Sequence, residues 1–242
     1  MLTFVNDGHP DNAEPGSSIP RHGDIYLIDA TPRKKSIVTD NLMEGYLSPG
    51  AYEDAYNIAF VMNTHADVSR NVIKGFVIGV MTYDDDTPYP NSKGLRVASN
   101  VIVTRDTTDS LPFGVAGVRT WAPDQFITDN TIFIPLSKKV VGVVVYGDGS
   151  QIENNKVIAM RIERHDYSSA NRSVGFAVGN TARNTVFKNN STYGFDVGLG
   201  CNPYQSVPHR VISHHSYNDT LGIDPRGVIA EQVIFRAMKK IV

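Results

Sequence analysis

The stretch Val97-Ala98-Ser99-Asn100-Val101-Ile102 returns with the same pattern as Ile127-Thr128-Asp129-Asn130-Thr131-Ile132. In both, an apolar residue is followed by two residues, an asparagine, one residue and a second apolar residue. The pattern recurs along the chain, with Thr192 at the last apolar position of one copy and His215 in place of asparagine in the final copy: Val38 to Met43, Val68 to Ile73, Ile152 to Val157, Phe187 to Thr192 and Ile212 to Tyr217. These asparagine positions are 25 to 35 residues apart, and a fixed period in this range is typical of a solenoid.

Short β-strands, not helices, are expected to fill each repeat. Runs rich in Val, Ile, Phe and Thr, such as Val140 to Tyr146 and Phe176 to Val178, are separated by Gly, Asn and Asp, and helical periodicity is almost absent. Asparagine tolerates the left-handed turn conformation, and identical asparagines stacked on successive layers can hydrogen-bond along the stack. The repeat therefore predicts an all-β, single-stranded parallel solenoid of about seven coils.

A glycine that opens a strand keeps step with the asparagine. Gly117 precedes Asn130 by 13 residues, and Gly142 precedes Asn155 by the same interval. Because strand side chains alternate between faces, the first and third residues after each glycine should point into the coil, and the second and fourth should point outward. With Gly117, Gly142, Gly175, Gly194 and Gly222 as the glycines, the predicted outward residues are Arg119, Trp121, Val144, Tyr146, Ala177, Gly179, Asp196, Gly198, Asp224 and Arg226.

In its period and its asparagine ladder the chain resembles the right-handed parallel β-helices of the pectin-lyase-like superfamily, from about Lys35 to Arg226. That superfamily includes polysaccharide lyases, glycoside hydrolases, uronic-acid epimerases and phage tailspikes, so the resemblance implies a carbohydrate partner but no particular reaction. Tyr193 to Asp196 and Leu221 to Arg226 are also similar to the Tyr-Gly-Phe-Asp-Pro-His stretch of mannuronan C-5 epimerases. Arg226 stands where that family has its catalytic histidine. The signature stretches of pectate lyases around their catalytic arginine are not visible.

The chain divides into three segments. Residues 1–22 are expected to form an N-terminal arm or cap, residues 23–227 the β-helix, and residues 228–242 a C-terminal cap. A final irregular coil is one alternative for the last segment, and it could also be where a longer parent chain was cut. A helical cap is favoured because apolar residues recur there every four positions, namely Ile229, Val233, Ala237 and Ile241.

Composition limits the classes of partner. The formal net charge is −2, and no basic stretch extends beyond Arg33 to Lys35 or Lys239 to Lys240, which argues against nucleic acid. No run reaches transmembrane length, so we expect no membrane association. Met1 to Pro20 lacks the apolar segment of a signal peptide, although an extracellular or phage-particle context suits the resemblance. Cys201 is the only cysteine, so no intrachain disulfide can form. We expect a polysaccharide as partner, and a homotrimer would favour the tailspike interpretation.

Two clusters of ionisable residues are candidates for proton abstraction. His209 and Arg210 end the loop that begins at Leu199, and a histidine can remove or return a proton at neutral pH. In the second cluster Arg164 could neutralise a uronate carboxylate while His165 takes the adjacent proton, which is the logic of β-elimination. A packed turn at His209 and a solvated loop at His165 are the alternatives.

The outward face of the glycine-initiated strands should supply the substrate contacts. Trp121 and Tyr146 could stack on sugar rings at one end of this face. Charged residues on the same face could bind hydroxyls or a uronate carboxylate, namely Arg119, Asp196, Asp224 and Arg226. Arg226 is also a catalytic candidate. Ordinary surface decoration of a solenoid is the alternative. Ca2+ could bind the carboxylates, but no zinc spacing is present and no cofactor is certain.

Two functional hypotheses follow. The first is an enzyme, a polysaccharide lyase or C-5 epimerase, that abstracts the C-5 proton of an acidic, uronate-containing polysaccharide with His209 or His165 as the base. The second is a non-catalytic glycan-binding or structural β-helix, such as a tailspike or surface-adhesin segment, in which the same residues only hold the sugar. The first is the primary expectation.

Overall fold

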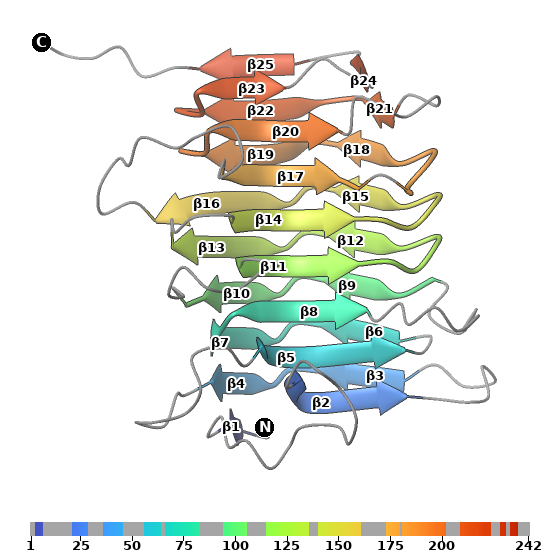
Figure 1. Cartoon of the computed structure of the whole chain (residues 1–242), viewed down its shortest axis with the longest axis vertical. Coiled ribbons are helices and arrows are strands. Elements are labelled where there is room, and N and C mark those ends of the chain that lie inside the picture. The colour runs from blue at the N-terminus through green and yellow to red at the C-terminus, as the bar shows by residue number, and fades with distance from the viewer. Residues whose placement is uncertain are drawn as a thin grey trace, which may run out of the picture.

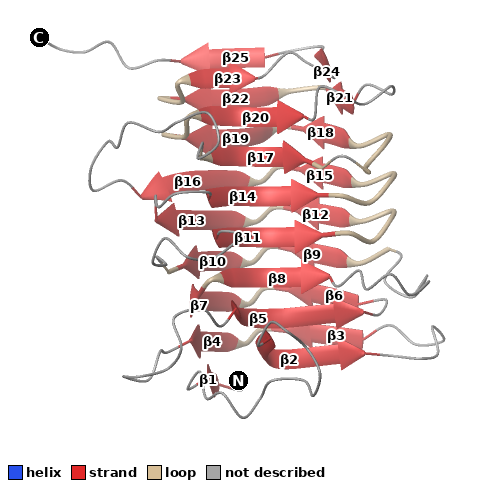
Figure 2. Cartoon of the chain, viewed as in Figure 1, coloured by secondary structure: helices blue, strands red, loops and turns tan. Residues whose placement is uncertain are grey.

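The structure, a computed structural model, describes residues 3–6, 21–28, 36–45, 56–63, 66–82, 94–105, 115–135, 140–160, 173–179, 181–201, 209–223, 228–230 and 233–236. In these ranges the regular structure consists of strands, with no helix (Figure 2). Every strand pairing is parallel, and each strand pairs with the one three positions later in the chain. This is the arrangement of a parallel β-helix, and it confirms the predicted fold class. The direction in which the coils wind stays a prediction.

Three sheets run along the stack, from the N-terminal coil to the C-terminal coil (Figure 1). Sheet A contains β1 (Thr3–Asn6), β4 (Leu42–Gly45), β7 (Val72–Phe76), β10 (Val101–Thr104), β13 (Thr131–Pro135), β16 (Lys156–Met160), β19 (Asn190–Tyr193), β22 (His214–Tyr217) and β25 (Val233–Arg236). Sheet B contains β2 (Arg21–Ile28), β5 (Tyr56–Asn63), β8 (Ile78–Thr82), β11 (Val115–Thr120), β14 (Val140–Val145), β17 (Val174–Val178), β20 (Val197–Cys201) and β23 (Leu221–Ile223). Sheet C contains β3 (Ser36–Thr39), β6 (Ala66–Ser69), β9 (Arg96–Ala98), β12 (Phe126–Thr128), β15 (Gln151–Glu153), β18 (Val186–Lys188), β21 (His209–Val211) and β24 (Val228–Ala230).

Buried apolar columns fill the interior, because the same type of residue returns at the same position in successive coils. One column lies two residues after each asparagine, on the inner face of sheet A: Ile73, Ile102, Ile132 and Val157. A second lies three residues before each asparagine, on sheet C: Val68, Val97, Ile127, Ile152 and Phe187. All of these side chains are fully buried. Each contributes about 1.5–3 kcal/mol by burial, so stacking of the coils is the main source of stability.

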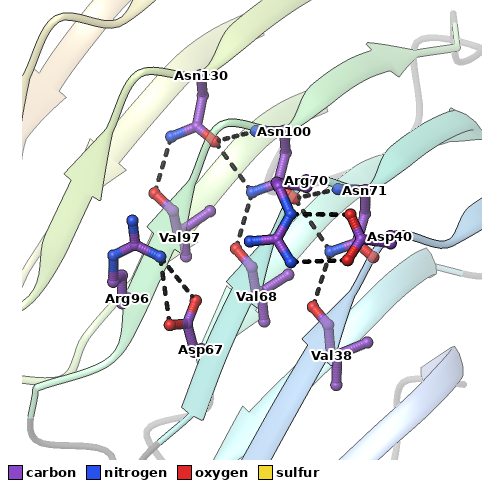
Figure 3. A network of polar contacts seen from close by, with 10 residues as sticks. All are labelled: Val38, Asp40, Asp67, Val68, Arg70, Asn71, Arg96, Val97, Asn100 and Asn130. Atoms are coloured by element: carbon purple, nitrogen blue, oxygen red, sulfur yellow. Dashed lines mark hydrogen bonds and ion pairs between the residues drawn. The ribbon is translucent and has the colours of Figure 1, made fainter.

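The predicted asparagine column is present (Figure 3). Asn100 shows how it works: its Nδ2 donates to Oδ1 of Asn130 at 3.0 Å and to the carbonyl oxygen of Val68 at 2.9 Å. Its Oδ1 accepts from the backbone N and from Nδ2 of Asn71 at 2.9 and 3.1 Å. The amide therefore uses all of its donors and acceptors inside the protein. Side-chain bonds of this kind join Asn41, Asn71, Asn100, Asn130, Asn155 and Asn190.

The left-handed residue of each of these turns is not the asparagine, as expected from its conformational preference, but the residue before it. Positive φ values of 52–62° occur at Asp40, Arg70, Ser99, Asp129, Asn154 and Asn189. That part of the prediction was wrong. The asparagine is needed at its position because only its side chain can donate and accept along the column. The residue before it points outward, and its identity can vary.

The strand register places His214, not His215, in the asparagine column. Asn190 of β19 pairs with His214 of β22, and Ser191 pairs with His215. The prediction of His215 for this position was therefore shifted by one residue. The cause lies three residues earlier, where Val211 is fully buried and faces the core while Ile212 is only half-buried.

The glycines that open the strands of sheet B are required by close contact with sheet A. A Cβ atom on Gly142 would lie 2.2 Å from Cγ1 of Val157, and one on Gly117 would lie 2.4 Å from Cγ2 of Ile132. Neither distance is possible, so glycine is the residue that fits where the two sheets approach each other. As predicted, the first and third residues after Gly117, Gly142 and Gly175 are buried, namely Val118, Thr120, Val143, Val145, Phe176 and Val178.

Gly194 does not belong to this column, contrary to the prediction. Val174 pairs with Val197, which aligns Gly198, and not Gly194, with Gly175. Gly194 has a φ of 80° and lies in the turn that precedes β20. The two glycines are four residues apart, and both are followed by alternating apolar residues, so spacing alone did not separate them.

The predicted C-terminal helical cap is wrong for the residues described. Val228–Ala230 forms β24 on the edge of sheet C, and Val233–Arg236 forms β25 on the edge of sheet A. The spacing of Ile229 and Val233 arises because the two residues lie in different strands, with a short connection between them. The alternative, a final coil, describes this segment. Residues 237–242 lie outside the described residues.

Candidate functional site

The aromatic residues predicted on sheet B do come together. Trp121 directly follows β11 and Tyr146 directly follows β14, and their rings stack with centroids 4.8 Å apart and planes 7° apart. Cζ of Arg119 lies 5.9 Å from the centroid of Trp121, but only 5% of Arg119 is exposed. A Cβ on Gly179 would lie 2.0 Å from Cδ1 of Tyr146, so this ring also lies against the next coil. The ring faces here are used mainly in packing one coil on another.

Asp196 lies elsewhere and has a different environment. Because β20 begins at Val197, Asp196 falls in the turn before that strand and not on its outer face. Its Oδ2 accepts hydrogen bonds from the backbone N and Oγ of Ser173 at 2.9 and 2.8 Å, and its own backbone N donates to that Oγ at 3.0 Å. Asp196 thus holds the entry to one coil against the entry to the next. Asp196 therefore does not lie on the outer face of a sheet B strand, where alternation from Gly194 placed it, and its role in substrate binding stays a prediction.

His209 and Arg210 point to opposite faces of sheet C. His209 is fully buried, and burial lowers the pKa of its imidazole, an effect that the nearby charge of Asp148 partly offsets. Arg210 is exposed and pairs in register with Val186 of the coil below. A buried imidazole does not face a surface groove, so these two neighbours do not form the exposed acid–base pair expected of a catalytic site.

The remaining predicted site residues lie outside the described part of the chain. They are Arg164, His165, Asp224 and Arg226. Of the predicted residues that the structure does describe, Arg119 lies in β11, and Trp121 and Tyr146 directly follow β11 and β14, the two middle strands of sheet B. Asp196 precedes β20, nearer the C-terminal edge of that sheet. His209 and Arg210 belong to sheet C.

A different surface feature emerges on sheet A. The third residue after each asparagine position faces outward, and on five successive strands, from β10 to β22, it is apolar or aromatic and half-buried: Val103, Phe133, Ile158, Tyr193 and Tyr217. We call these residues the outer strip. The rings of Tyr193 and Tyr217 stack with centroids 4.6 Å apart and planes 8° apart. Strands lie about 4.8 Å apart, so the strip forms a straight, nearly continuous apolar line across the coils.

Polar groups border the outer strip. Nζ of Lys156, an exposed residue, lies 5.0 Å from the centroid of Tyr193. The ring of His215 lies 6.4 Å from that of Tyr217. Thr131 and Ser191 occupy the same outward column as Lys156. The outward side chains of β10, β13, β16, β19 and β22 include no carboxylate.

Several other surface charges in the described coils are paired with the neighbouring coil. Two such pairs are arginine–aspartate contacts on sheet C or the turn that follows it (Figure 3). The contacts are Arg96 Nη1 to Asp67 Oδ1 at 3.0 Å, Arg70 Nη2 to Asp40 Oδ2 at 2.7 Å, Lys74 Nζ to Glu44 Oε1 at 3.6 Å, and Lys188 Nζ to Glu153 Oε2 at 3.8 Å. Exposed pairs of this type contribute about 0–1 kcal/mol each. Lys156 contrasts with them, because its partner is an aromatic ring of the outer strip.

Sequence reasoning missed the outer strip, although its signal was present. The asparagine frame used only the residues three before, and two after, each asparagine, which face the core. Moving one further residue along gives Val103, Phe133, Ile158 and Tyr193 directly. The last member, Tyr217, appears only after the register is corrected to His214.

Beneath the outer strip lies a buried group of polar side chains, which we call the inner polar cluster: Thr192, His214, Ser216 and Asp219. Asp219 accepts hydrogen bonds from Oγ of Ser216 at 2.6 Å, from the backbone N of Phe195 at 2.7 Å and from Oγ1 of Thr192. Nε2 of His214 lies 3.2 Å from Oγ1 of Thr192. Burial raises the pKa of Asp219, and burial, assisted by the charge of His215, lowers the pKa of His214 to about 3.

Within the described ranges no group of three or more His, Cys, Asp or Glu side chains is placed to hold a metal ion. Asp84, Asp85 and Asp86, three consecutive carboxylates, lie outside those ranges. In the described part of the chain no helix is long and apolar enough to cross a membrane.

The fold and the outer strip define a class: a parallel β-helix with an apolar, aromatic line on one outer sheet face. Comparison with known proteins adds no narrower family, since no family model, no curated protein and no solved structure matches the chain. The pectin-lyase-like superfamily therefore stays a prediction that rests on the repeat.

Proposed function

We propose that the protein is a glycan-binding β-helix that holds an acidic polysaccharide along the outer strip of sheet A. The observation that carries the proposal is the alignment of Phe133, Ile158, Tyr193 and Tyr217 on successive coils, with Lys156 beside them. A continuous apolar line on an outer face is a typical binding surface. Repetition along the stack suits a polymer, because each coil can contact the next unit of the ligand.

The chemistry of the strip suits sugars with carboxylates. One ring face of Tyr193 stacks on one ring face of Tyr217, which leaves the ring edges and hydroxyl groups to contact a sugar. The ammonium group of Lys156 can bind a uronate carboxylate. The five strands of the outer strip carry no carboxylate that would repel the uronate. Ser191 and Thr131 add hydroxyl groups in the same column.

A binding role accounts for the described residues better than a catalytic one. Proton abstraction at C-5 needs an exposed base next to a group that neutralises the carboxylate. Of the four predicted catalytic residues, His209 is buried, and Arg210 lies on sheet C and not on sheet A, which carries the outer strip. His165 and Arg226 lie outside the described residues. A lyase or epimerase activity is therefore an outcome that the binding experiment should also monitor.

Affinity for alginate, polygalacturonate and a neutral glucan, measured by affinity electrophoresis and calorimetry, tests the proposal. We expect the two acidic polymers to bind, with affinity that falls as salt rises. Substituting the stacked pair together (Tyr193→Thr with Tyr217→Thr) should weaken binding about tenfold or more, since each aromatic contact is worth about 1 kcal/mol. Lys156→Gln should weaken binding and reduce its dependence on salt.

Two variants on sheet C serve as matched controls. Phe126→Thr removes an aromatic side chain that is 39% exposed, and Lys188→Gln removes a lysine on the same sheet. Neither should change affinity. Absence of binding to either acidic polymer, or equal losses in the sheet A and sheet C variants, would refute the proposal. Release of unsaturated uronates, or exchange of the C-5 proton with solvent, would indicate the catalytic alternative.

A further inference from the structure

The inner faces of β19 and β22 break the apolar column of sheet A. Two residues after each earlier asparagine the side chain is Ile102, Ile132 or Val157, whereas the next two coils have Thr192 and Ser216. Both are fully buried. Burying hydroxyl groups is unfavourable unless they are hydrogen-bonded, so this change needs an explanation.

The hydrogen bonds of the inner polar cluster fix where its protons lie. Asp219 is an acceptor, so the hydroxyl hydrogen of Thr192 points to its carboxylate. Oγ1 of Thr192 then accepts from Nε2 of His214, which must carry the hydrogen of the neutral imidazole. Nδ1 of His214 therefore carries no hydrogen. It is buried and has no hydrogen-bond partner among the residues that the structure describes.

A second proton on His214 would be poorly tolerated. It would place a charge and a new N–H donor at Nδ1, inside the core, where no acceptor meets it. The edge of the His214 ring packs against Phe176 at a centroid distance of 5.9 Å, which excludes water from that side. His214 meets Asp219 through Thr192, and the carboxylate of Asp219 already accepts hydrogen bonds from Thr192, Ser216 and the backbone N of Phe195.

The remaining surroundings offer no compensation. His215, on the opposite face of the same strand, is a second titratable group, and its charge lowers the pKa of His214 further. Among the side chains that the structure describes beside His214, those on the neighbouring strands are not titratable: Asn190 and Thr192 of β19 and Phe176 of β17. Protonation must therefore be accompanied by opening of the packing around His214.

We propose that the inner polar cluster is an acid-sensitive latch on the coils that carry Tyr193 and Tyr217. Thr192 precedes Tyr193, and Ser216 precedes Tyr217, so each clustered side chain is the inner neighbour of a residue of the outer strip. Protonation of His214 separates β19 from β22, and separation of these strands parts the two stacked rings. Acid thus opens the C-terminal half of the strip and releases the polysaccharide. The release step rests on the proposed function, whereas the opening step does not.

Hydrogen exchange of the intact chain, corrected for the intrinsic pH dependence of exchange, measures the opening step. Between pH 7.5 and 5 we expect the opening equilibrium of residues 190–193 and 214–217 to rise about 30-fold, since a histidine of ordinary pKa is mostly protonated at pH 5 once exposed. Residues 101–104 and 131–135, which have apolar inner faces, should keep their protection.

Two variants and a matched control assign the effect to His214. His214→Asn continues the asparagine column and His214→Phe fills the same space without a titratable group, so either should abolish the pH dependence. His215→Asn alters the adjacent histidine on the outer face and should behave as the wild type does. If one His214 variant fails to fold, the pH dependence of hydrogen exchange in the other variant, compared with that of the wild type, tests the inference.

The outcomes separate the latch from the proposed function. Acid opening that is lost in the His214 variants, together with polysaccharide binding that weakens at pH 5 in the wild type but not in the His214 variants, supports the inference. Opening without any polysaccharide binding supports the latch and refutes the proposed function and the release step. Binding with no pH-dependent exchange in residues 190–193 and 214–217 refutes the latch and leaves the proposed function intact. Loss of the pH dependence in His215→Asn also refutes the latch.

Discussion

At the scale of single residues, Asn100 connects three coils through one side chain. Asn100→Ala removes its bonds to Asn71, Asn130 and the carbonyl of Val68, so the buried backbone N of Asn71 loses its acceptor, while Nδ2 of Asn71 and Oδ1 of Asn130 each keep one partner. A buried group left unpaired costs about 1–3 kcal/mol and each further lost hydrogen bond about 0.5–1.5 kcal/mol, so we expect the free energy of unfolding to fall by about 3 kcal/mol. Urea denaturation followed by circular dichroism measures this change.

Asn41→Ala is the control for that variant, because Asn41 is only half-buried and bonds to one asparagine, Asn71. It should cost clearly less than Asn100→Ala. Equal costs would mean that the column contributes little and that the asparagines act only through turn geometry.

Gly142 illustrates a residue whose absence of a side chain is itself required. Gly142→Ala would place a Cβ 2.2 Å from Val157 and 2.5 Å from the carbonyl oxygen of Gly175. Overpacking of this kind costs about 1–3 kcal/mol, and we expect a fall in thermal midpoint to match. The control is Gly200→Ala, whose Cβ would meet its nearest neighbours at an ordinary 3.6 Å. Adding Val157→Ala to Gly142→Ala should recover part of the loss if the clash with Val157 is the cause.

At the scale of the element, β22 acquires a pH dependence whose sign follows from burial. Burial, followed by the charge of His215, lowers the pKa of His214 from 6.5 to about 3. Between these values the unfolded chain binds a proton that the folded chain excludes, so stability is greatest above pH 6.5 and falls as the pH decreases. We expect a loss of about 2 kcal/mol in the free energy of unfolding between pH 7.5 and 5.

Asp219 acts with the opposite sign, because burial raises its pKa. Its contribution to the free energy of unfolding is complete below pH 3.8, the ordinary pKa of an aspartate. This contribution is lost as the pH rises through the higher pKa that Asp219 has in the folded state. Urea denaturation of the wild type and of His214→Asn at both pH values therefore isolates the histidine. A variant that loses as much stability as the wild type at pH 5 would show that another group controls the acid response.

The strands illustrate what the sequence could and could not determine. The asparagine and glycine columns were predictable because stacking demands the same side chain at the same place in every coil. Two registers were missed, at Gly194 and at His215, in the C-terminal coils. There a polar cluster replaces the apolar residues of the core, so the pattern of inner residues that fixes the register is lost. The outer strip could have been found by counting three residues from each asparagine.

The site was less predictable than the fold for a physical reason. Stacking of the coils does not demand one residue type on an outer face, so alternation indicates where these side chains point but not what they do. Trp121 and Tyr146 were correctly brought together, yet each ring contacts a neighbouring coil. His209 was attractive as a base in the sequence, but its position at the start of β21 turns it into the core. A residue's face, and not its chemical type, decided its role.

At the scale of the whole molecule, the stack should respond to damage locally. Each sheet joins a coil only to the coils directly below and above, so stability is a sum of coil and nearest-neighbour terms. The side-chain bonds of Asn100 likewise join only adjacent coils. Disturbing one coil should therefore weaken its neighbours and leave distant coils unchanged.

Hydrogen exchange of Asn100→Ala tests this property. We expect faster exchange in residues 68–76, 96–104 and 126–135, which belong to the coils that Asn100 joins, and no change in residues 186–193 or 214–217. Ile37→Thr, at a side chain that is 70% exposed, is the control and should leave every coil protected. Faster exchange spread evenly over all three sheets would instead show that the β-helix opens as one cooperative unit. In that case the acid response of His214 could not be confined to the coils that carry Tyr193 and Tyr217. Opening at β22 would then expose the coil at Phe133 as readily as the coil at Tyr217.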